Sequence, residues 1–449
     1  MALPLEGIRV VDLTHVYAGP TCTRILSDLG ADVVKVEAPQ RIDITRNLIY
    51  TDNDPGTEPW NRTCYYNVRN AGKRSITLDL GSEKGHALLT QLIAHADVLA
   101  ESFSPRVMAN FGLDFESVRK VKPDIIMLSM SGYGQTGPYR DWGAYGMGLE
   151  PASGICQLTG YRGGPPLRTG ISFTDPLSGI LAAGAVLAAL HHRRRTGKGQ
   201  FIDLSEQEAA IPLVGAALMD YLMNGRLPER MGNRSPYAAP QGCYPCRGED
   251  EWLVISITSD EEWAAFCRAA GPPEWAADER FADILARYEN HDALDEAIGG
   301  WTRTEDKYEA FHLLQRAGVK AAPVLNGRDM LCDPHFKARG HFDVVDSPIV
   351  GRRPVHRHLV AKFDRLEAKA RGPAPRLGEH NREVLGGLLG LSDEELAALE
   401  EEKVIGTRPE APVPFELIAA ALKLPMDRLI EVGAVLRVEP DYKKTLGIE

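Results

Sequence analysis

Asp175 is the residue of this sequence whose type and position offer the most chemistry. It lies in the segment 168–179, directly before Pro176 and ahead of a long apolar stretch. An aspartate followed by proline commonly begins a helix, with its side chain accepting hydrogen bonds from the first backbone N–H groups. A carboxylate in such a position can also act as a covalent nucleophile. The neighbouring residues favour the helix cap and leave the second role open.

The motif Cys243-Tyr-Pro-Cys246 holds the one close pair among seven cysteines. A zinc site would usually need a second pair, or histidines at ligand spacing. A redox dithiol would normally open a helix after a strand. Neither context is evident, so we expect no metal centre. The odd number of scattered cysteines indicates reduced thiols.

The glycines of this chain do not form a phosphate-binding motif. The first predicted strand-to-helix turn contains Ala18-Gly19-Pro20 but lacks the G-x-G-x-x-G that brings backbone close to a dinucleotide. Gly72-Lys73-Arg74 and Gly197-Lys198-Gly199 lack the upstream glycine of a P-loop. The sequence therefore does not favour an NAD dehydrogenase or a P-loop nucleotide site.

Length, composition and charge indicate a soluble protein of two or more domains. The 449 residues are 44% apolar and 25% charged, with a net charge of -11 that argues against broad nucleic-acid binding. The N-terminus lacks the features of a signal peptide, and the most apolar stretch, 180–190, is about half the length needed to cross a bilayer. We expect a cytoplasmic protein with no nucleic-acid or membrane partner.

Strand and helix signals alternate over the first 135 residues, which predicts a parallel sheet with crossover helices. The expected strands are 10–13, 32–37, 75–80, 96–100, 124–129 and, further on, 201–204, with helices over 19–29 and 83–95.

The helix that follows Asp175 is predicted over 176–194, with Thr196 and Gly197 ending it. Its expected buried stripe consists of Leu177, Ile180, Leu181, Leu187 and Leu190. Gly184 falls on the same face, which suggests a close backbone approach by a neighbouring element.

The second half of the chain is predicted to contain a smaller α+β unit between two irregular stretches, at 225–242 and 327–373. The unit has an expected strand at 252–256 and helices near 261–270, 292–301 and 307–317. A capping box at 392–395 predicts a further helix, and two amphipathic pieces near 415–422 and 426–432 follow in the tail.

Several segments, taken in order, resemble the class III CoA-transferases, the family of formyl-CoA transferase and the carnitine CoA-transferase. The segments that carry the resemblance are 5–15 with 18–20, 29–37, 70–79, 132–138, 195–200 and 377–380. The likeness extends from about residue 3 to about residue 405.

The resemblance implies an α/β fold with a Rossmann-like large domain and a smaller α+β domain. The large domain would comprise 1–205 and 374–449, and the small domain 241–326, with linkers at 206–240 and 327–373. Two such ring-shaped chains would be interlocked in a homodimer, or in a heteromer with a related subunit.

The resemblance also implies that Asp175 is the nucleophile of a CoA-transferase. Its carboxylate would attack an acyl-CoA, such as succinyl-CoA, to give a mixed anhydride and then an aspartyl-CoA thioester, which a carboxylic acid acceptor would resolve. No cofactor beyond coenzyme A itself is implied. Backbone N–H groups at the helix N-terminus would stabilise the negative charge.

The family's CoA-binding positions carry over to His15, Val16, Tyr17, Ala18, Leu78 and Phe103, each of which is equally compatible with a core position. Tyr145 stands where the related α-methylacyl-CoA racemases have a histidine, which favours transfer over racemisation and leaves the racemase as the alternative. A noncatalytic subunit of a heteromer is the rival from another class, and Asp175 argues against it.

Some positions depart from formyl-CoA transferase. Ala38 and Asn110 stand where it has CoA-contacting arginines, Tyr17 replaces a glutamine, and its active-site run of glycines is missing near 238–242. With Tyr17 and Tyr145 lining the substrate pocket, a larger acid, aromatic or dicarboxylic, is expected.

Overall fold

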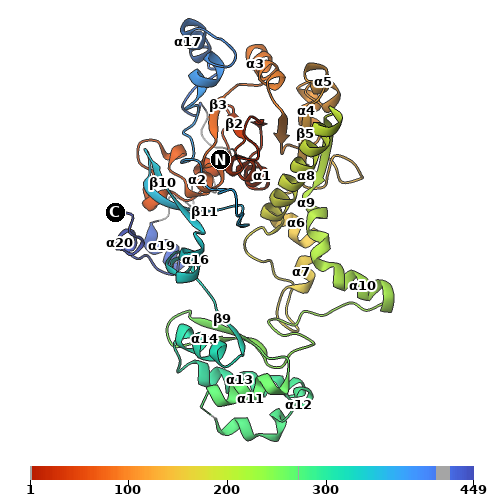
Figure 1. The fold of residues 1–449 in the computed structure, drawn as a ribbon, viewed down its shortest axis with the longest axis vertical. Helices are drawn as coiled ribbons and strands as arrows, with labels where there is room; N and C mark the ends of the chain where they lie inside the picture. The colour runs from red at the N-terminus through yellow and green to blue at the C-terminus, as the bar shows by residue number, and fades with distance from the viewer. Residues whose placement is uncertain (1–2, 272, 411–424) are drawn as a thin grey trace. The chain divides into compact units, whose positions relative to one another are not determined.

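The chain forms two compact units in a computed structural model that describes residues 3–271, 273–410 and 425–449 (Figure 1). Unit 1 comprises 1–155, 169–218 and 334–449, and unit 2 comprises 156–168 and 219–333. The domain and linker boundaries expected from the family stay predictions.

Unit 1 is built on a six-stranded parallel sheet with the order β3-β2-β1-β4-β5-β6, which is the order of doubly wound α/β sheets. Its strands are β1 (Arg9–Asp12), β2 (Asp32–Glu37), β3 (Arg74–Thr77), β4 (Val98–Glu101), β5 (Ile126–Ser131) and β6 (Gln200–Ser205). The six strands expected from the sequence are therefore confirmed within a few residues.

The helices of the first 224 residues connect these strands or follow β6. They are α1 (Ala18–Asp28), α2 (Cys64–Asn70), α3 (Glu83–Ala94), α4 (Arg106–Asn110), α5 (Phe115–Val121), α6 (Gly146–Ala152), α7 (Ile155–Leu158), α8 (Thr174–Thr196), α9 (Glu206–Ala210) and α10 (Gly215–Asn224).

Both faces of the sheet are buried, because successive strand residues point to opposite sides. Val11, Val34 and Leu99 pack into one core with residues of α3, α5 and the segment 384–405. Val10 and Val33 pack into the other core with residues of α1 and α8. The C-terminal segment 384–405 thus helps to cover one face of a sheet whose strands all come from the first 205 residues.

The helix α8 packs against α1 through small residues. The buried stripe expected from its sequence is wrong at Ile180 and Leu181, whereas Leu187 and Leu190 are partly buried against the second core. The buried side chains of α8 include Ser178, Ala182 and Val186, whereas Ile180 and Leu181 are exposed. The close approach also lies elsewhere than expected. A Cβ at Gly184 would meet nothing within 4 Å, but a Cβ at Gly179 would lie 2.5 Å from the Ala18 carbonyl oxygen.

The 23 residues of α8 are long and apolar enough to cross a bilayer by length and composition. In the structure α8 contributes Ala182, Ala183, Val186 and Ala189 to the second core of unit 1. Gly197, with a φ of 72°, ends the helix as its sequence predicts.

Unit 2 contains an antiparallel three-stranded sheet with the order β7-β8-β9. Its elements include β7 (Gln241–Pro245), β8 (Trp252–Ser256), β9 (Lys320–Pro323), α11 (Asp260–Ala269), α12 (Ile284–Glu289), α13 (His291–Thr302), α14 (Lys307–Arg316) and α15 (Gly327–Cys332). The expected strand and three helices of this region are confirmed. The core of unit 2 includes the aromatic residues Trp263, Phe266 and Phe281, which pack with residues of the sheet and of α13 and α14.

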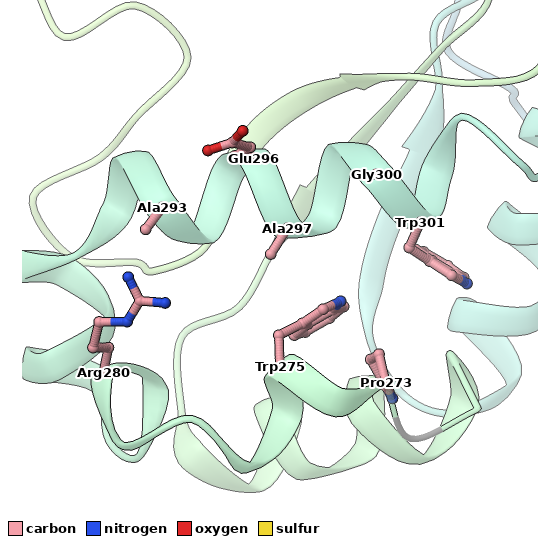
Figure 2. A pocket seen from close by; sticks show the side chains of 8 residues that line it. All are labelled: Pro273, Trp275, Arg280, Ala293, Glu296, Ala297, Gly300 and Trp301. Carbon is pink, nitrogen blue, oxygen red and sulfur yellow. The ribbon is translucent and has the colours of Figure 1, made fainter.

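A pocket of about 560 Å³ lies on α13 of unit 2 (Figure 2). Arg280 lies at one end of it in this view, and Pro273 and Trp301 lie at the other. Its ionisable lining consists of Arg280 and Glu296, and none of the predicted site residues belongs to it.

The stretch 327–373 is not irregular throughout, contrary to the prediction. Besides α15 it contains α16 (Pro334–Arg339) and an antiparallel hairpin of β10 (Phe342–Ser347) and β11 (Gly351–His356). Neither strand alternates strictly between polar and apolar residues, and Pro354 lies inside β11, so the strand signal is weak.

The capping box at Ser392 and Glu395 begins α17 (Asp393–Glu401), as predicted. The predicted piece 415–422 lies outside the described residues, and the piece 426–432 forms α19 (Met426–Glu431). A last helix, α20 (Tyr442–Leu446), is tied to the 3₁₀ helix at 51–53 by the ion pair of Lys443 with Asp52, 3.0 Å long.

The paired cysteines lie at the end of β7. Burial raises the pKa of both thiols, that of Cys246 to about 11, so both are protonated at neutral pH. Among the described residues, no group of three or more His, Cys, Asp or Glu side chains is arranged to hold a metal ion.

The contrast between Gly179 and Gly184 predicts opposite effects of one substitution on one helix. Gly179→Ala should lower the free energy of unfolding by about 1–3 kcal/mol, because the new methyl group must push α1 and α8 apart. Gly184→Ala should raise it by up to about 1 kcal/mol through helix propensity. Urea denaturation measures both, and equal effects of the two variants would contradict the packing described.

Candidate active site

The loops at the carboxyl ends of the strands gather where the strand order reverses, between β1 and β4. Ligands of open α/β sheets bind at this switch point. Here the turn after β1 is joined to the turn after β4, because the backbone N–H of His15 donates to Ser102 Oγ over 3.0 Å. The His15 ring also meets Phe103 edge to face, with 5.9 Å between centroids.

Three buried ion pairs lie beneath this edge of the sheet: Asp12–Lys73 at 3.0 Å, Lys35–Asp43 at 3.1 Å and Glu37–Arg46 at 2.8 Å. All six side chains are fully enclosed or nearly so. Burial alone would raise the pKa of Asp43, but Lys35 and further partners hold it well below its ordinary value. These groups are therefore charged at neutral pH.

The four predicted CoA contacts of residues 15–18 form one turn over this network. Val16 has a φ of 70°, and its N–H faces both Asp43 carboxylate oxygens at 3.3 Å. Tyr17 occupies the N-cap position of α1 and is partly buried, while Ala18 is the buried first residue of that helix. Ion pairs below the turn thus hold it in a strained backbone conformation.

The other two predicted CoA contacts differ from each other in exposure. Phe103 is partly buried and borders the first core. Leu78 is fully enclosed within that core. The turn 15–18 and Phe103 come together in the structure, whereas Leu78 offers no surface to a ligand in this conformation.

Asp175 is a buried residue in the first turn of α8, and its predicted N-cap role is wrong. The helix begins at Thr174, with Phe173 in the N-cap position, so Asp175 is the second helical residue. The N–H of Phe173 donates to Glu150 Oε1 over 2.7 Å, which starts the helix early. Pro176 is tolerated because N–H groups of a first turn lack partners within the helix.

The carboxyl groups of Asp175 and Glu206 are hydrogen-bonded to each other. Glu206 is the first residue of α9, which Ser205 caps directly after β6. Burial raises the pKa of Asp175 to about 6, although Glu206, Arg69 and Thr174 act in the opposite direction. Burial and the charge of Asp175 raise the pKa of Glu206 to about 8. At neutral pH the pair therefore holds one proton, on Glu206.

The backbone of α6 lies directly against the Asp175 carboxylate. A Cβ at Gly146 would lie 2.6 Å from Asp175 Cγ, so position 146 accommodates no side chain while the carboxylate keeps its place. Tyr145 precedes it in the N-cap position of α6 and is 62% exposed. The predicted pocket residue Tyr145 is thus adjacent in sequence to the residue that contacts the Asp175 carboxylate.

A guanidinium between two aromatic rings lies near the same carboxylate. Arg69 Cζ is 3.6 Å from the Tyr17 ring centroid and 3.7 Å from that of Tyr65. The charge of Arg69 lowers the pKa of Asp175, and the charge of Asp175 contributes to raising the pKa of Tyr65, which burial raises most. Tyr17, Tyr65, Arg69 and Asp175 therefore share one electrostatic environment.

The sequence interpretation missed Glu206, Arg69 and Tyr65. An acidic residue behind a serine cap is typical of any helix N-terminus, so Glu206 carries no distinctive signal. Arg69 and Tyr65 lie on the short helix α2, for which no periodicity was available. Their role becomes visible only when the fold brings α2 next to the turn after β1.

Comparisons with known proteins identify the family of this chain. The model of CoA-transferase family III matches residues 5–381. The chain belongs to CoA-transferase family III. Succinyl-CoA–D-citramalate CoA-transferase of Chloroflexus aurantiacus is 36% identical to this transferase over 403 residues, which are 90% of this chain and 98% of the relative.

Two further proteins extend the comparison. Succinate–glutarate CoA-transferase of Agrobacterium fabrum is 34% identical, covering 86% of this chain and 96% of its own. The crystal structure of a CaiB/BaiF family protein from Brucella suis matches with a TM-score of 0.78 and 34% identity, over 86% of this transferase and all of that chain. The family expected from the sequence is confirmed.

Gly146→Ala tests the contact between α6 and the Asp175 carboxylate. The added methyl group must displace the Asp175 carboxylate, so we expect kcat/KM for CoA transfer to fall at least about tenfold, as misplacement of a reacting group does. Gly148→Ala is the matched control on the same helix, because a Cβ there meets nothing within 4 Å. Equal activity of the two variants in a steady-state exchange assay would contradict the described position of Asp175.

Proposed function

We propose that this family III CoA-transferase moves CoA from an acyl-CoA, with succinyl-CoA as donor, to a carboxylic acid through covalent intermediates on Asp175. The observation that supports this most is the buried carboxylate of Asp175 in the first turn of α8, hydrogen-bonded to a carboxylic acid on α9. Succinyl-CoA or succinate appears in the names of both relatives described above.

The covalent steps balance without a cofactor beyond CoA. The Asp175 carboxylate attacks the thioester carbonyl, which forms a mixed anhydride and releases CoA thiolate. The thiolate attacks the aspartyl carbonyl, which leaves aspartyl-CoA and frees the donor acid as a carboxylate. The acceptor carboxylate then attacks aspartyl-CoA, and the released thiolate takes the acceptor acyl group and restores Asp175. No proton is consumed, and the energy of the thioester is retained.

Glu206 has the role that the sequence interpretation gave to backbone N–H groups. The N–H of Asp175 already donates to Ser172, that of Leu177 to Phe173, and Pro176 has none. The protonated Glu206 instead donates to the Asp175 carboxylate. We propose that it also donates to the aspartyl oxygen that carries negative charge when thiolate or acid attacks.

Transfer remains preferred over racemisation because Tyr145, and no histidine, precedes Gly146. A racemase must remove a proton from carbon with a base of suitable pKa. The presence of Asp175 with a proton-bearing partner also supports a catalytic subunit, whether the assembly is a homodimer or a heteromer.

Asp175→Asn tests the nucleophile. The amide cannot attack the thioester, so we expect exchange of CoA between succinyl-CoA and acceptor acids to fall at least about 1000-fold. In the wild-type protein, hydroxylamine should convert Asp175 to its hydroxamate only in the presence of an acyl-CoA donor, as peptide mass spectrometry would show. Normal exchange by the Asn variant, or labelling that needs no donor, would refute the mechanism.

The shared proton predicts a bell-shaped pH profile of kcat/KM. Activity should rise as Asp175 ionises around pH 6, and it should fall as Glu206 loses its proton around pH 8. Glu206→Gln keeps a hydrogen-bond donor but cannot titrate, so the loss of activity at high pH should disappear. Glu206→Leu should lower kcat about 10- to 100-fold at neutral pH, because a hydrogen bond to a charged group is lost.

Glu208→Gln is the control for this prediction, since Glu208 lies on the same short helix with an exposed side chain. It should keep the wild-type profile. Persistence of the high-pH limb in Glu206→Gln would assign that limb to another group.

A further inference from the structure

Two aromatic rings pack against the Arg69 guanidinium from adjacent sides. Tyr17 and Tyr65 lie within 3.7 Å of Arg69 Cζ, and the two rings contact each other edge to face at 5.9 Å. The residue is 8% exposed. The guanidinium is therefore largely removed from water.

One edge of this guanidinium has no protein partner. Nη1 donates to the Tyr65 carbonyl oxygen over 2.7 Å. The Nε–H is buried and forms no hydrogen bond. Within the described ranges, no hydrogen bond uses Nη2, and no carboxylate forms an ion pair with Arg69. A buried cation with an unpaired N–H is costly, so a ligand that pairs with it is favoured strongly.

The chemistry of that edge is specific. Nε is enclosed by the protein, whereas Nη2 is not, so a carboxylate oxygen can accept a charge-assisted hydrogen bond from Nη2–H, and removal from water strengthens such a pair. The charge of Arg69 acts on Asp175, yet the two side chains form no direct ion pair. A carboxylate bound to Arg69 is thus near the nucleophile without being the group that reacts with it.

We propose that Arg69 binds the second, non-reacting carboxylate of a dicarboxylic acid and of the acyl-CoA made from it. This inference rests on the proposed function, because the thioester must lie at Asp175 for the acyl chain to extend toward Arg69. The phosphates of CoA are a poorer match, since they lie at the other end of the pantetheine arm from the reacting thioester. The larger acid expected from the sequence is therefore dicarboxylic. The alternative, an aromatic acid, is tested below with benzoate.

Matched acids separate the role of Arg69 from that of Asp175. The wild-type protein should use succinate and glutarate as acceptors with kcat/KM at least about 30-fold above butyrate, valerate and succinamate, which lack the second charge. Benzoate tests the aromatic alternative. With the donors, kcat/KM should likewise be higher for succinyl-CoA than for butyryl-CoA.

Arg69→Gln should remove this preference by lowering kcat/KM for succinate at least about 30-fold while leaving butyrate within about threefold. Arg69→Lys keeps the charge without the planar guanidinium, so its kcat/KM for succinate should lie between those of the wild type and the Gln variant. This second variant also covers the case that the Gln variant folds poorly. Arg119→Gln is the control for loss of a charge, because Arg119 is exposed and lies beside the Phe115 ring. It should change kcat/KM for neither succinate nor butyrate.

Three results would overturn the proposal. Equal use of succinate and butyrate by the wild-type protein would show that no second carboxylate is recognised. A preference for benzoate would assign the rings to an aromatic substrate. An equal loss for both acids in both variants would give Arg69 a structural role. Labelling of Asp175 by butyryl-CoA as well as succinyl-CoA would leave the proposed function intact in each case, whereas no labelling by any donor would refute that function itself.

Discussion

The buried ion pairs around the carboxyl ends of β1 and β2 are the interaction on which the site depends. Lys73 Nζ contacts Asp12, Thr23 and the side chain of Asn70, the last residue of α2. Arg46 joins Glu37 to the hydroxyl group of Tyr66, in the middle of α2. Removing one partner of such a pair leaves a buried charge and destabilises a protein by about 3–5 kcal/mol. The network therefore fixes α2, and with it the direction of Arg69, which lies between Tyr66 and Asn70.

The same network links the sheet to the turn of residues 15–18. Asp43 accepts from Lys35, from the Val16 N–H and from Thr45, so one carboxylate holds a strand, a strained turn and a following loop together. The position of Tyr17 over Arg69 follows from this arrangement. A parallel sheet brings the strand ends to one edge, but the ion pairs determine which side chains meet there.

The sequence predicted the parallel sheet because periodicity and turn residues are local properties. Strand β2 matches its predicted range of 32–37, and Gly197 ends α8 as expected. The predicted buried face of α8 was wrong at Ile180 and Leu181, because small side chains are favoured over large apolar ones where two helices cross closely. Gly179, facing the Ala18 carbonyl, lets the backbones approach, and that contact turns Ile180 and Leu181 outward. The Asp175–Glu206 pair and the packing of Tyr17 against Arg69 join distant segments, so neither residue spacing nor composition could indicate them.

The charges of the site explain why its three ionisable groups belong together. A dicarboxylate that approaches Asp175 brings two negative charges toward a third in surroundings of low dielectric constant, where repulsion is strong. The proton on Glu206 keeps that residue neutral, and Arg69 supplies one positive charge, so the unliganded group of three is neutral overall near pH 7. Because Arg69 can pair with the distal carboxylate, the reacting end approaches Asp175 with one charge fewer to oppose it. Loss of the Glu206 proton would restore that repulsion. In the proposed mechanism, binding of the acid and reactivity of Asp175 therefore depend on the same proton.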